Sequence, residues 1–292
     1  GQAPQDLPAD DSIAALGGDL SYPLQYGYAA VGQVAALGCG VDPAWLGRQV
    51  FAFQPHQTHF TASPEEVLPL PAGIPAESAV FLPNMETAVN LVMDARPLIG
   101  ERVAIFGQGI VGLLTCALLA RYPLAELLTL DPLANRRAAS LQAGATRSLD
   151  PSAENNLMQV HGEAGLDLAI ELSGAPRALD QAIAVTGFAG RVLIGSWYGS
   201  KPVQLDLGAA FHRSRIRLLS SQVSSLEPAL SGRWSKARRF ELAWKMLRQV
   251  QPQRWITHRL PFAQAARGYQ LLDQQPDQAI QVIFDYAVNQ QE

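Results

Sequence analysis

An apolar run of 18 residues, from Val103 to Ala120, contains three glycines, Gly107, Gly109 and Gly112. Only two polar side chains interrupt the run, so its hydropathy alone would match a membrane-spanning helix. The glycines argue against that interpretation, because they divide the run into a short strand, a tight turn and a helix. We therefore predict a strand–turn–helix unit of a globular domain, without membrane association.

Short apolar segments alternate with helical patterns from about residue 89 onward. The predicted strands cover residues 103–106, 126–130, 166–170, 191–195 and 216–220. The predicted helices cover residues 110–121, 135–143, 177–185 and 237–250. Such alternation is typical of βαβ units, so we predict an α/β fold with a Rossmann-type, doubly wound parallel sheet.

The two ends of the chain have a different pattern. The first 88 residues are rich in glycine and proline and carry short alternating segments at 30–34 and 49–53, which predicts a small β-rich domain. After residue 250 the tail contains the segment ITHRLPF (256–262), and the pattern then predicts a helix to about Leu272 and a strand at 280–284. We expect this tail to pack against the N-terminal domain.

The glycine turn has the spacing of a dinucleotide-binding loop. Gly107 permits the tight turn, Gly109 lets the backbone approach a pyrophosphate, and Gly112 lets the helix pack closely on the sheet. The helix begins with Ile110 and Val111, and the amides of its first turn point at the phosphates. The alternative is a glycine turn of the same fold that binds no nucleotide.

Asp131 ends the second predicted strand, 131 − 112 = 19 residues beyond the last glycine. A carboxylate at this point accepts both hydroxyls of the adenosine ribose and repels a 2′-phosphate, which favours NAD(H) over NADP(H). Arg136 and Arg137 follow closely and are able to pair with a phosphate, so NADP(H) is the alternative.

Composition narrows the class of partner. A net charge of −4 and a pI near 5.8 leave no broad positive surface for nucleic acid, so we expect a small-molecule substrate. The two cysteines, Cys39 and Cys116, form neither a disulfide framework nor a CxxC pair. This cysteine usage fits the reducing cytoplasm.

Several segments, taken in order, resemble the medium-chain dehydrogenase/reductase superfamily: PLQYGYAAVGQV (23–34), GRQV (47–50), LPLPAGIPAESAVFLP (68–83), the glycine turn, LDPLANRRAASLQAGAT (130–146) and HRLPFAQAARGYQLL (258–272). The resemblance implies a GroES-like catalytic domain at 1–88, a Rossmann domain at 89–253, and a return of 254–292 to the catalytic domain. It also implies a nucleotide in the interdomain cleft and a homodimer formed by sheet extension near 216–221. The family's first strands would precede residue 1.

The departures from this family concern zinc. Where zinc members have Gly-His-Glu, this chain has Gly27-Tyr28-Ala29, and a later ligand position falls near Pro83-Asn84-Met85. The four-cysteine lobe is missing after Phe53. A catalytic zinc normally needs three protein ligands, so we predict no metal site and zinc-free chemistry. The segment around Tyr28 is also similar, locally, to the bacteriochlorophyllide a dehydrogenase branch.

Without zinc, a phenol or an imidazole must assist hydride transfer. By resemblance, Tyr28 stands at the nicotinamide end of the cleft, where its hydroxyl would donate to a substrate oxygen; the alternative is a core tyrosine. His56 follows a strand in a polar turn and suits acid–base work, or it is an ordinary surface-loop histidine. Strand ends and the cleft add three predicted cofactor contacts, Thr87, Ser173 and Gly195.

Two further expectations concern charged residues. Glu86 either meets the cofactor or caps the helix that begins beside it. The helix at 237–250 is expected to pack through its apolar face, with Lys236, Arg238 and Arg239 in water.

The sequence as a whole predicts an NAD(H)-dependent, zinc-independent oxidoreductase for an alcohol/carbonyl pair. The alternatives are a catalytically silent NAD(H)-binding sensor or scaffold, and a zinc-dependent alcohol dehydrogenase with atypical ligands.

Overall fold

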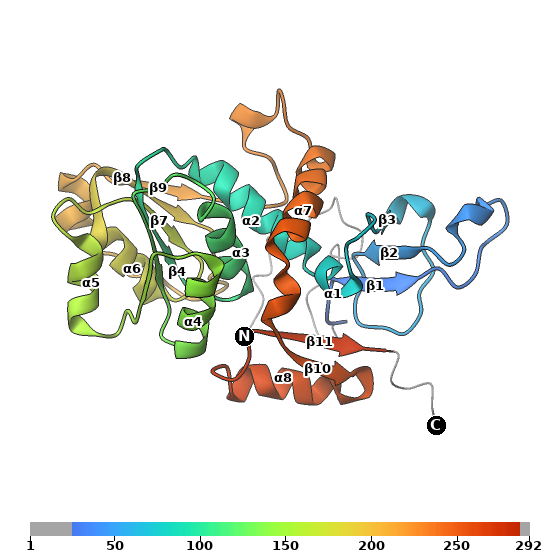
Figure 1. Cartoon of the computed structure of the whole chain (residues 1–292). Coiled ribbons are helices and arrows are strands. Elements are labelled where there is room, and N and C mark those ends of the chain that lie inside the picture. The colour runs from blue at the N-terminus through green and yellow to red at the C-terminus, as the bar shows by residue number, and fades with distance from the viewer. Residues whose placement is uncertain (1–24, 287–292) are drawn as a thin grey trace.

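A six-stranded parallel sheet is the largest unit of the computed structural model, which describes residues 25–286 (Figure 1). Its strand order is β6-β5-β4-β7-β8-β9. The strands are β4 (Arg102–Phe106), β5 (Glu126–Leu130), β6 (Arg147–Leu149), β7 (Leu166–Glu171), β8 (Thr186–Ile194) and β9 (Arg217–Ser220). The order reverses beside β4, and ligands of doubly wound sheets bind at the carboxyl ends of the strands at such a reversal.

Helices cover both faces of this sheet. Val103 and Ile105 of β4 belong to one hydrophobic core and Ala104 and Phe106 to the other, because successive strand residues point to opposite faces. The first core includes residues of α2 (Leu82–Ala95), α3 (Ile110–Leu119), α4 (Ala134–Ala143) and α7 (Lys236–Val250). The second includes residues of α5 (Glu154–His161) and α6 (Pro176–Val185). Burial on both faces explains why the strands read as continuous apolar runs.

The predicted Rossmann α/β fold is confirmed, with differences at some element ends. The apolar run divides as expected, since β4 ends at Phe106 and α3 begins at Ile110. No helix within residues 25–286 is long and apolar enough to cross a membrane. The pattern missed β6 because this strand has only three residues, all half-buried, and therefore no apolar run.

Smaller sheets lie beside the parallel one (Figure 1). An antiparallel sheet contains β1 (Ala30–Gln33), β2 (Gln49–Ala52) and β3 (Val67–Pro69), and α1 (Ala76–Ala79) follows it. Near the C-terminus, β10 (Ile256–Pro261) and β11 (Gln281–Asp285) pair in parallel and are connected through α8 (Ala265–Gln274). Single turns of helix lie at Pro43–Trp45, Pro64–Glu66, Leu207–Phe211, Pro228–Leu230, Pro252–Trp255 and Phe262–Gln264.

Two glycines of the turn between β4 and α3 have no room for a side chain. Gly107 has a φ of +92°, and a Cβ there would lie 2.7 Å from the Ser173 backbone. A Cβ on Gly112 would lie 2.1 Å from the Gly107 carbonyl oxygen. Close contact of the helix, the turn and β7 therefore depends on glycine at both positions.

Candidate cofactor site

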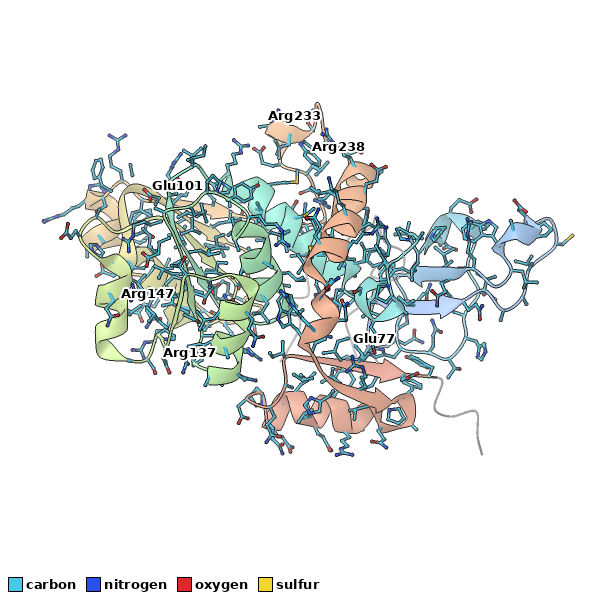
Figure 2. All side chains as sticks on the ribbon, in the orientation of Figure 1. Glu77, Glu101, Arg137, Arg147, Arg233 and Arg238 are labelled. Carbon is cyan, nitrogen blue, oxygen red and sulfur yellow. The ribbon has the colours of Figure 1, made fainter. Side chains whose placement is uncertain are left out.

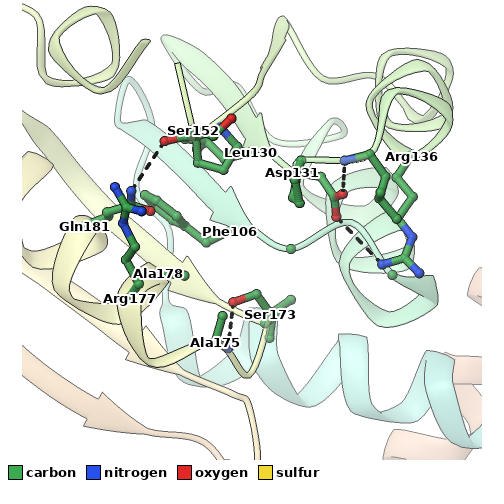
Figure 3. A pocket seen from close by; sticks show the side chains of 16 residues that line it. Phe106, Leu130, Asp131, Arg136, Ser152, Ser173, Ala175, Arg177, Ala178 and Gln181 are labelled. Atoms are coloured by element: carbon green, nitrogen blue, oxygen red, sulfur yellow. Dashed lines mark hydrogen bonds and ion pairs between the residues drawn. The ribbon is translucent and has the colours of Figure 1, made fainter. Parts of the chain in front are cut away.

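A cavity of about 360 Å³ opens at the carboxyl ends of β4 and β5 (Figure 3). Its apolar lining includes Phe106, Leu130 and Ala178, and its rim carries Arg177 and Gln181. Five residues predicted to bind the cofactor line it together: Gly107, Gly109, Asp131, Arg136 and Ser173. An apolar floor with a few polar groups at its edge is the usual make-up of a small-molecule site.

Asp131 is held rigidly at the edge of this cavity. Its Oδ2 accepts the Gln108 amide at 2.7 Å, and its Oδ1 accepts the Leu133 amide at 2.9 Å. Each carboxylate oxygen has a further lone pair, so both can still accept a hydroxyl. The two amides thus fix the orientation of a carboxylate that is preorganised for a ribose.

Two arginines give the cavity a positive balance. Arg136 Nη1 lies 4.0 Å from Asp131 Oδ2, and Arg177 lines the opposite side. The Arg136 Nε is buried without a hydrogen-bond partner within the described residues. Two cations against one carboxylate suit a ligand with phosphate charges.

The start of α3 is open toward the cavity. Gly109 is the N-cap residue, no side chain caps the helix there, and a Cβ on Gly109 would meet nothing within 4 Å. Ile110 and Val111 form the first turn, half-buried, with their amides at the positive end of the helix. These groups can hold a diphosphate.

Glu171 is a buried residue that sequence reasoning missed. At the end of β7, its Oε1 accepts the amide of Ser173 at 2.7 Å and the Ser173 hydroxyl, while its Oε2 accepts the Tyr198 hydroxyl at 2.5 Å. Burial, followed by the hydrogen bond to Glu171, raises the pKa of Tyr198. The carboxylate thereby joins the turn after β7 to the loop after β8. The signal available in the sequence was the position of Glu171, a charged residue at the end of an apolar strand.

Thr87 and Gly195 lie outside the cavity lining. The Thr87 hydroxyl donates to the Pro83 carbonyl within α2 at 2.9 Å. A Cβ on Gly195 would lie 2.4 Å from a methyl group of Leu91, so this glycine allows the end of β8 to pack against α2. The contact of either residue with a cofactor stays a prediction.

His56 lies among aromatic rings rather than alone on a surface loop. Its Nε2 is 3.0 Å from the Tyr269 hydroxyl, and its ring meets Phe284 edge-on with centroids 4.9 Å apart. The imidazole also lies against Gly27, where a Cβ would be 2.7 Å from Cε1, and Gly27 precedes Tyr28, which is 43% exposed. His56 thus connects the N-terminal segment to β11 and α8, and its catalytic role stays a prediction.

Burial lowers the pKa of His56 below its ordinary value of 6.5. The unfolded chain therefore binds the proton more readily, and the free energy of unfolding should fall as the pH drops below about 6.5. Urea unfolding at pH 7.5 and 5.5 should show a smaller loss in His56→Gln than in wild type. His59→Gln, at an exposed position of the same loop, is the matched control. An equal loss in wild type and His56→Gln would contradict this assignment.

Comparison with known proteins finds similar dehydrogenase sequences. The model of a family described as zinc-binding dehydrogenases matches residues 111–241. D-guloside 3-dehydrogenase of Escherichia coli (strain K12) is 24% identical over 267 residues, which cover 88% of this chain and 76% of that protein. These matches confirm the predicted resemblance to the medium-chain dehydrogenase/reductase superfamily.

Solved structures support the same fold. An Escherichia coli CFT073 protein described as a short chain alcohol dehydrogenase, complexed with NADH, has a TM-score of 0.73 at 17% identity, covering 89% of this chain and 83% of that one. A zinc-binding dehydrogenase from Sinorhizobium meliloti 1021 bound to NADP has a TM-score of 0.69 at 17% identity, with coverages of 89% and 80%. These likenesses are of fold, and the cofactors named are those of the two neighbouring structures.

The match to zinc-binding dehydrogenases does not include the zinc-ligand positions of the family. Residues 111–241 exclude both Tyr28 and Pro83. Within residues 25–286, no three His, Cys, Asp or Glu side chains lie close enough to hold a metal ion. The family description therefore carries no information about zinc in this chain.

Proposed function

We propose that this protein is an NAD(H)-dependent, zinc-independent oxidoreductase that transfers a hydride between the nicotinamide and an alcohol/carbonyl substrate. The observation that carries the choice of NAD(H) is the fixed carboxylate of Asp131 at the end of β5. It is 3% exposed and accepts two backbone amides, so it has little freedom to turn away from a 2′-phosphate. A fixed negative charge at the ribose disfavours NADP(H).

Arg136 supports the same assignment despite its positive charge. Its guanidinium lies 4.0 Å from the Asp131 carboxylate, which offsets part of the positive charge of the arginine within the cavity. A 2′-phosphate would have to draw the arginine away from this carboxylate while lying beside it. Ribose hydroxyls need no such rearrangement.

Zinc-free chemistry is supported by the side chains at the family's ligand positions. Tyr28 carries a phenol in place of an imidazole, and the side chain of Pro83 has no atom that could bind a metal. The residues present do not fit a catalytic zinc, which normally takes three protein ligands. We therefore derive no step through a metal.

We assign proton transfer to Tyr28 and His56, the two catalytic residues predicted from the sequence. The cofactor, when bound, accepts or donates the hydride, and the protein must orient the substrate and move a proton. We propose that the Tyr28 hydroxyl donates a hydrogen bond to the substrate oxygen. His56, whose lowered pKa keeps it neutral near pH 7, would accept or return the proton.

Asp131→Asn tests the cofactor assignment. We expect the Kd for NADH to rise at least roughly tenfold, because charge-assisted hydrogen bonds to the ribose contribute about 1.5–3 kcal/mol. The affinity for NADPH should increase. Titration of both cofactors by intrinsic fluorescence gives the two constants. Asp167→Asn is the matched control, because Asp167 accepts the Arg102 amide at the opposite end of the sheet.

Wild-type protein should also oxidise NADH in the presence of some member of a panel of aldehydes, ketones and quinones. Tight NADH binding with no turnover across the panel would favour the silent sensor over the enzyme. Tighter binding of NADPH than of NADH by wild type would overturn the choice of NAD(H).

A further inference from the structure

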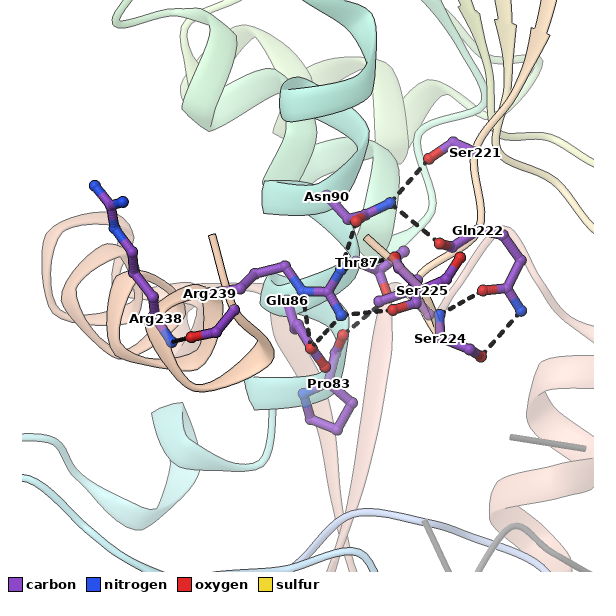
Figure 4. A network of polar contacts seen from close by, with 12 residues as sticks. Pro83, Glu86, Thr87, Asn90, Ser221, Gln222, Ser224, Ser225, Arg238 and Arg239 are labelled. Atoms are coloured by element: carbon purple, nitrogen blue, oxygen red, sulfur yellow. Dashed lines mark hydrogen bonds and ion pairs between the residues drawn. The ribbon is translucent and has the colours of Figure 1, made fainter. Parts of the chain in front are cut away.

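Arg239 lies in the protein interior, which corrects the expectation that it faces water. It is 0% exposed, although it is the fourth residue of α7 and its neighbour Arg238 is exposed. Figure 4 shows its side chain directed at α2 and at the segment 221–225, while Arg238 points away. Helical periodicity could not predict this burial, because the partner carboxylate is 153 residues away in the sequence.

Each of the five N–H groups of Arg239 has an acceptor. Nε and Nη2 donate to Glu86 Oε1 at 3.0 and 2.8 Å. Nη1 donates to Asn90 Oδ1 at 2.5 Å and to the Ser225 carbonyl at 3.3 Å, and Nη2 donates to the Val223 carbonyl at 2.5 Å. A planar guanidinium with every donor used holds its partners in one geometry.

Ser221, at the first end of the segment 221–225, also contacts α2. Asn90 Nδ2 donates to the Ser221 hydroxyl oxygen at 3.1 Å and to Asp94 Oδ2 at 2.9 Å. The Ser221 hydroxyl donates to the same Asp94 oxygen at 2.6 Å. Residues 221–225 are thus joined to α2 by side chains from two helices (Figure 4).

The position of this segment relates it to the cofactor. A doubly wound sheet binds each half of a dinucleotide over one half of its strands. Asp131 marks the adenosine half over β4 and β5, so the nicotinamide half belongs over β7, β8 and β9. Residues 221–225 directly follow β9, and the Ser221 amide donates to the Ile194 carbonyl at the end of β8 at 2.9 Å.

We propose that Arg239 is a positioning residue, which fixes the backbone of residues 221–225 where the nicotinamide binds. This positioning role rests on the proposed function, because it assumes that the nicotinamide binds over β7, β8 and β9. Arg239 does not touch the cofactor in this arrangement. It acts through the carbonyls of Val223 and Ser225, which it links to Glu86 and Asn90 of α2.

A comparison of two ligands separates this role from a general structural one. ADP-ribose contains the adenosine and diphosphate of NADH but lacks the nicotinamide. In Arg239→Lys, which keeps the charge but loses the five-donor fork, we expect the Kd for NADH to rise about tenfold and that for ADP-ribose to stay within about twofold. Both are measured by isothermal titration calorimetry.

A double variant tests the same role in a protein that is expected to keep its fold. Arg239→Met with Glu86→Met replaces the buried ion pair by apolar side chains, an exchange that is often tolerated, while it removes the donors to the two carbonyls. We expect the same selective loss of NADH affinity in this variant. Arg238→Met is the matched control, because Arg238 lies beside Arg233 at the outer end of α7 (Figure 2).

The outcomes are distinct. Equal weakening of NADH and ADP-ribose, or no change of either ligand in folded variants, would overturn the positioning role. Wild-type protein that binds neither ligand would instead overturn the proposed function, and this inference with it. If wild-type protein bound NADH no more tightly than ADP-ribose, the nicotinamide half would contribute no binding affinity. Arg239 would then have no nicotinamide contacts to position, and the proposal would fail.

Discussion

Gly109→Ala is expected to raise the Kd for NADH by at least roughly tenfold, while the free energy of unfolding stays within about 1 kcal/mol of wild type. Gly109 has a φ of −67° and a ψ of −176°, which alanine adopts without strain. A methyl group there would meet no protein atom within 4 Å. It would instead occupy the space at the start of α3 that a diphosphate must approach.

Gly112→Ala is the matched variant, and it should lower the stability of the fold as well as NADH binding. Its methyl group would lie 2.1 Å from the Gly107 carbonyl, so the helix must shift away from the turn. We expect a loss of about 1–3 kcal/mol in the free energy of unfolding, together with weaker NADH binding. Urea unfolding and calorimetry with NADH measure both effects. Unchanged NADH binding by a folded Gly109→Ala protein would show that the diphosphate does not lie on this turn.

The sequence predicted the parts of this molecule that local chemistry determines. The turn from Gly107 to Gly112 and the acid Asp131 could be placed because their spacing follows from a single βαβ unit. The doubly wound sheet followed from the alternation of apolar strands with helices, since burial on both faces demands it. These features needed no knowledge of which segments meet in space.

The residues that the sequence did not place correctly depend on contacts between distant segments. Arg239 was expected in water because its helix showed an apolar face elsewhere, yet Glu86 and Asn90 bring it into the interior. Glu171 carried no motif, and its partner Tyr198 comes from the loop after the next strand. The environment of His56 depends on Tyr269, which is 213 residues away in the sequence. Such pairings follow from the fold, so periodicity alone cannot give them.

Glu86→Met should lower the free energy of unfolding by about 3–5 kcal/mol, because it leaves the guanidinium of Arg239 buried without a counter-charge. Glu86 is 5% exposed, and its Oε1 accepts two of the five donors of that side chain. Neither helix capping nor contact with a cofactor, the two roles expected for Glu86, describes this pair. Urea unfolding of the single variant, monitored by circular dichroism, measures the effect.

The cost of Glu86→Met should be largely recovered when Arg239 is also replaced by methionine. Removing both charges eliminates the unpaired buried cation, and two methionines fill a similar volume with flexible apolar side chains. Recovery should be incomplete, because the carbonyls of Val223 and Ser225 then lose their donor. Glu77→Met is the control, since Glu77 pairs with Arg259 at the exposed surface, where solvent screening leaves an ion pair little effect on stability. Additive losses in the double variant would mean that the two side chains stabilise the fold independently, contrary to the contacts between α2 and α7.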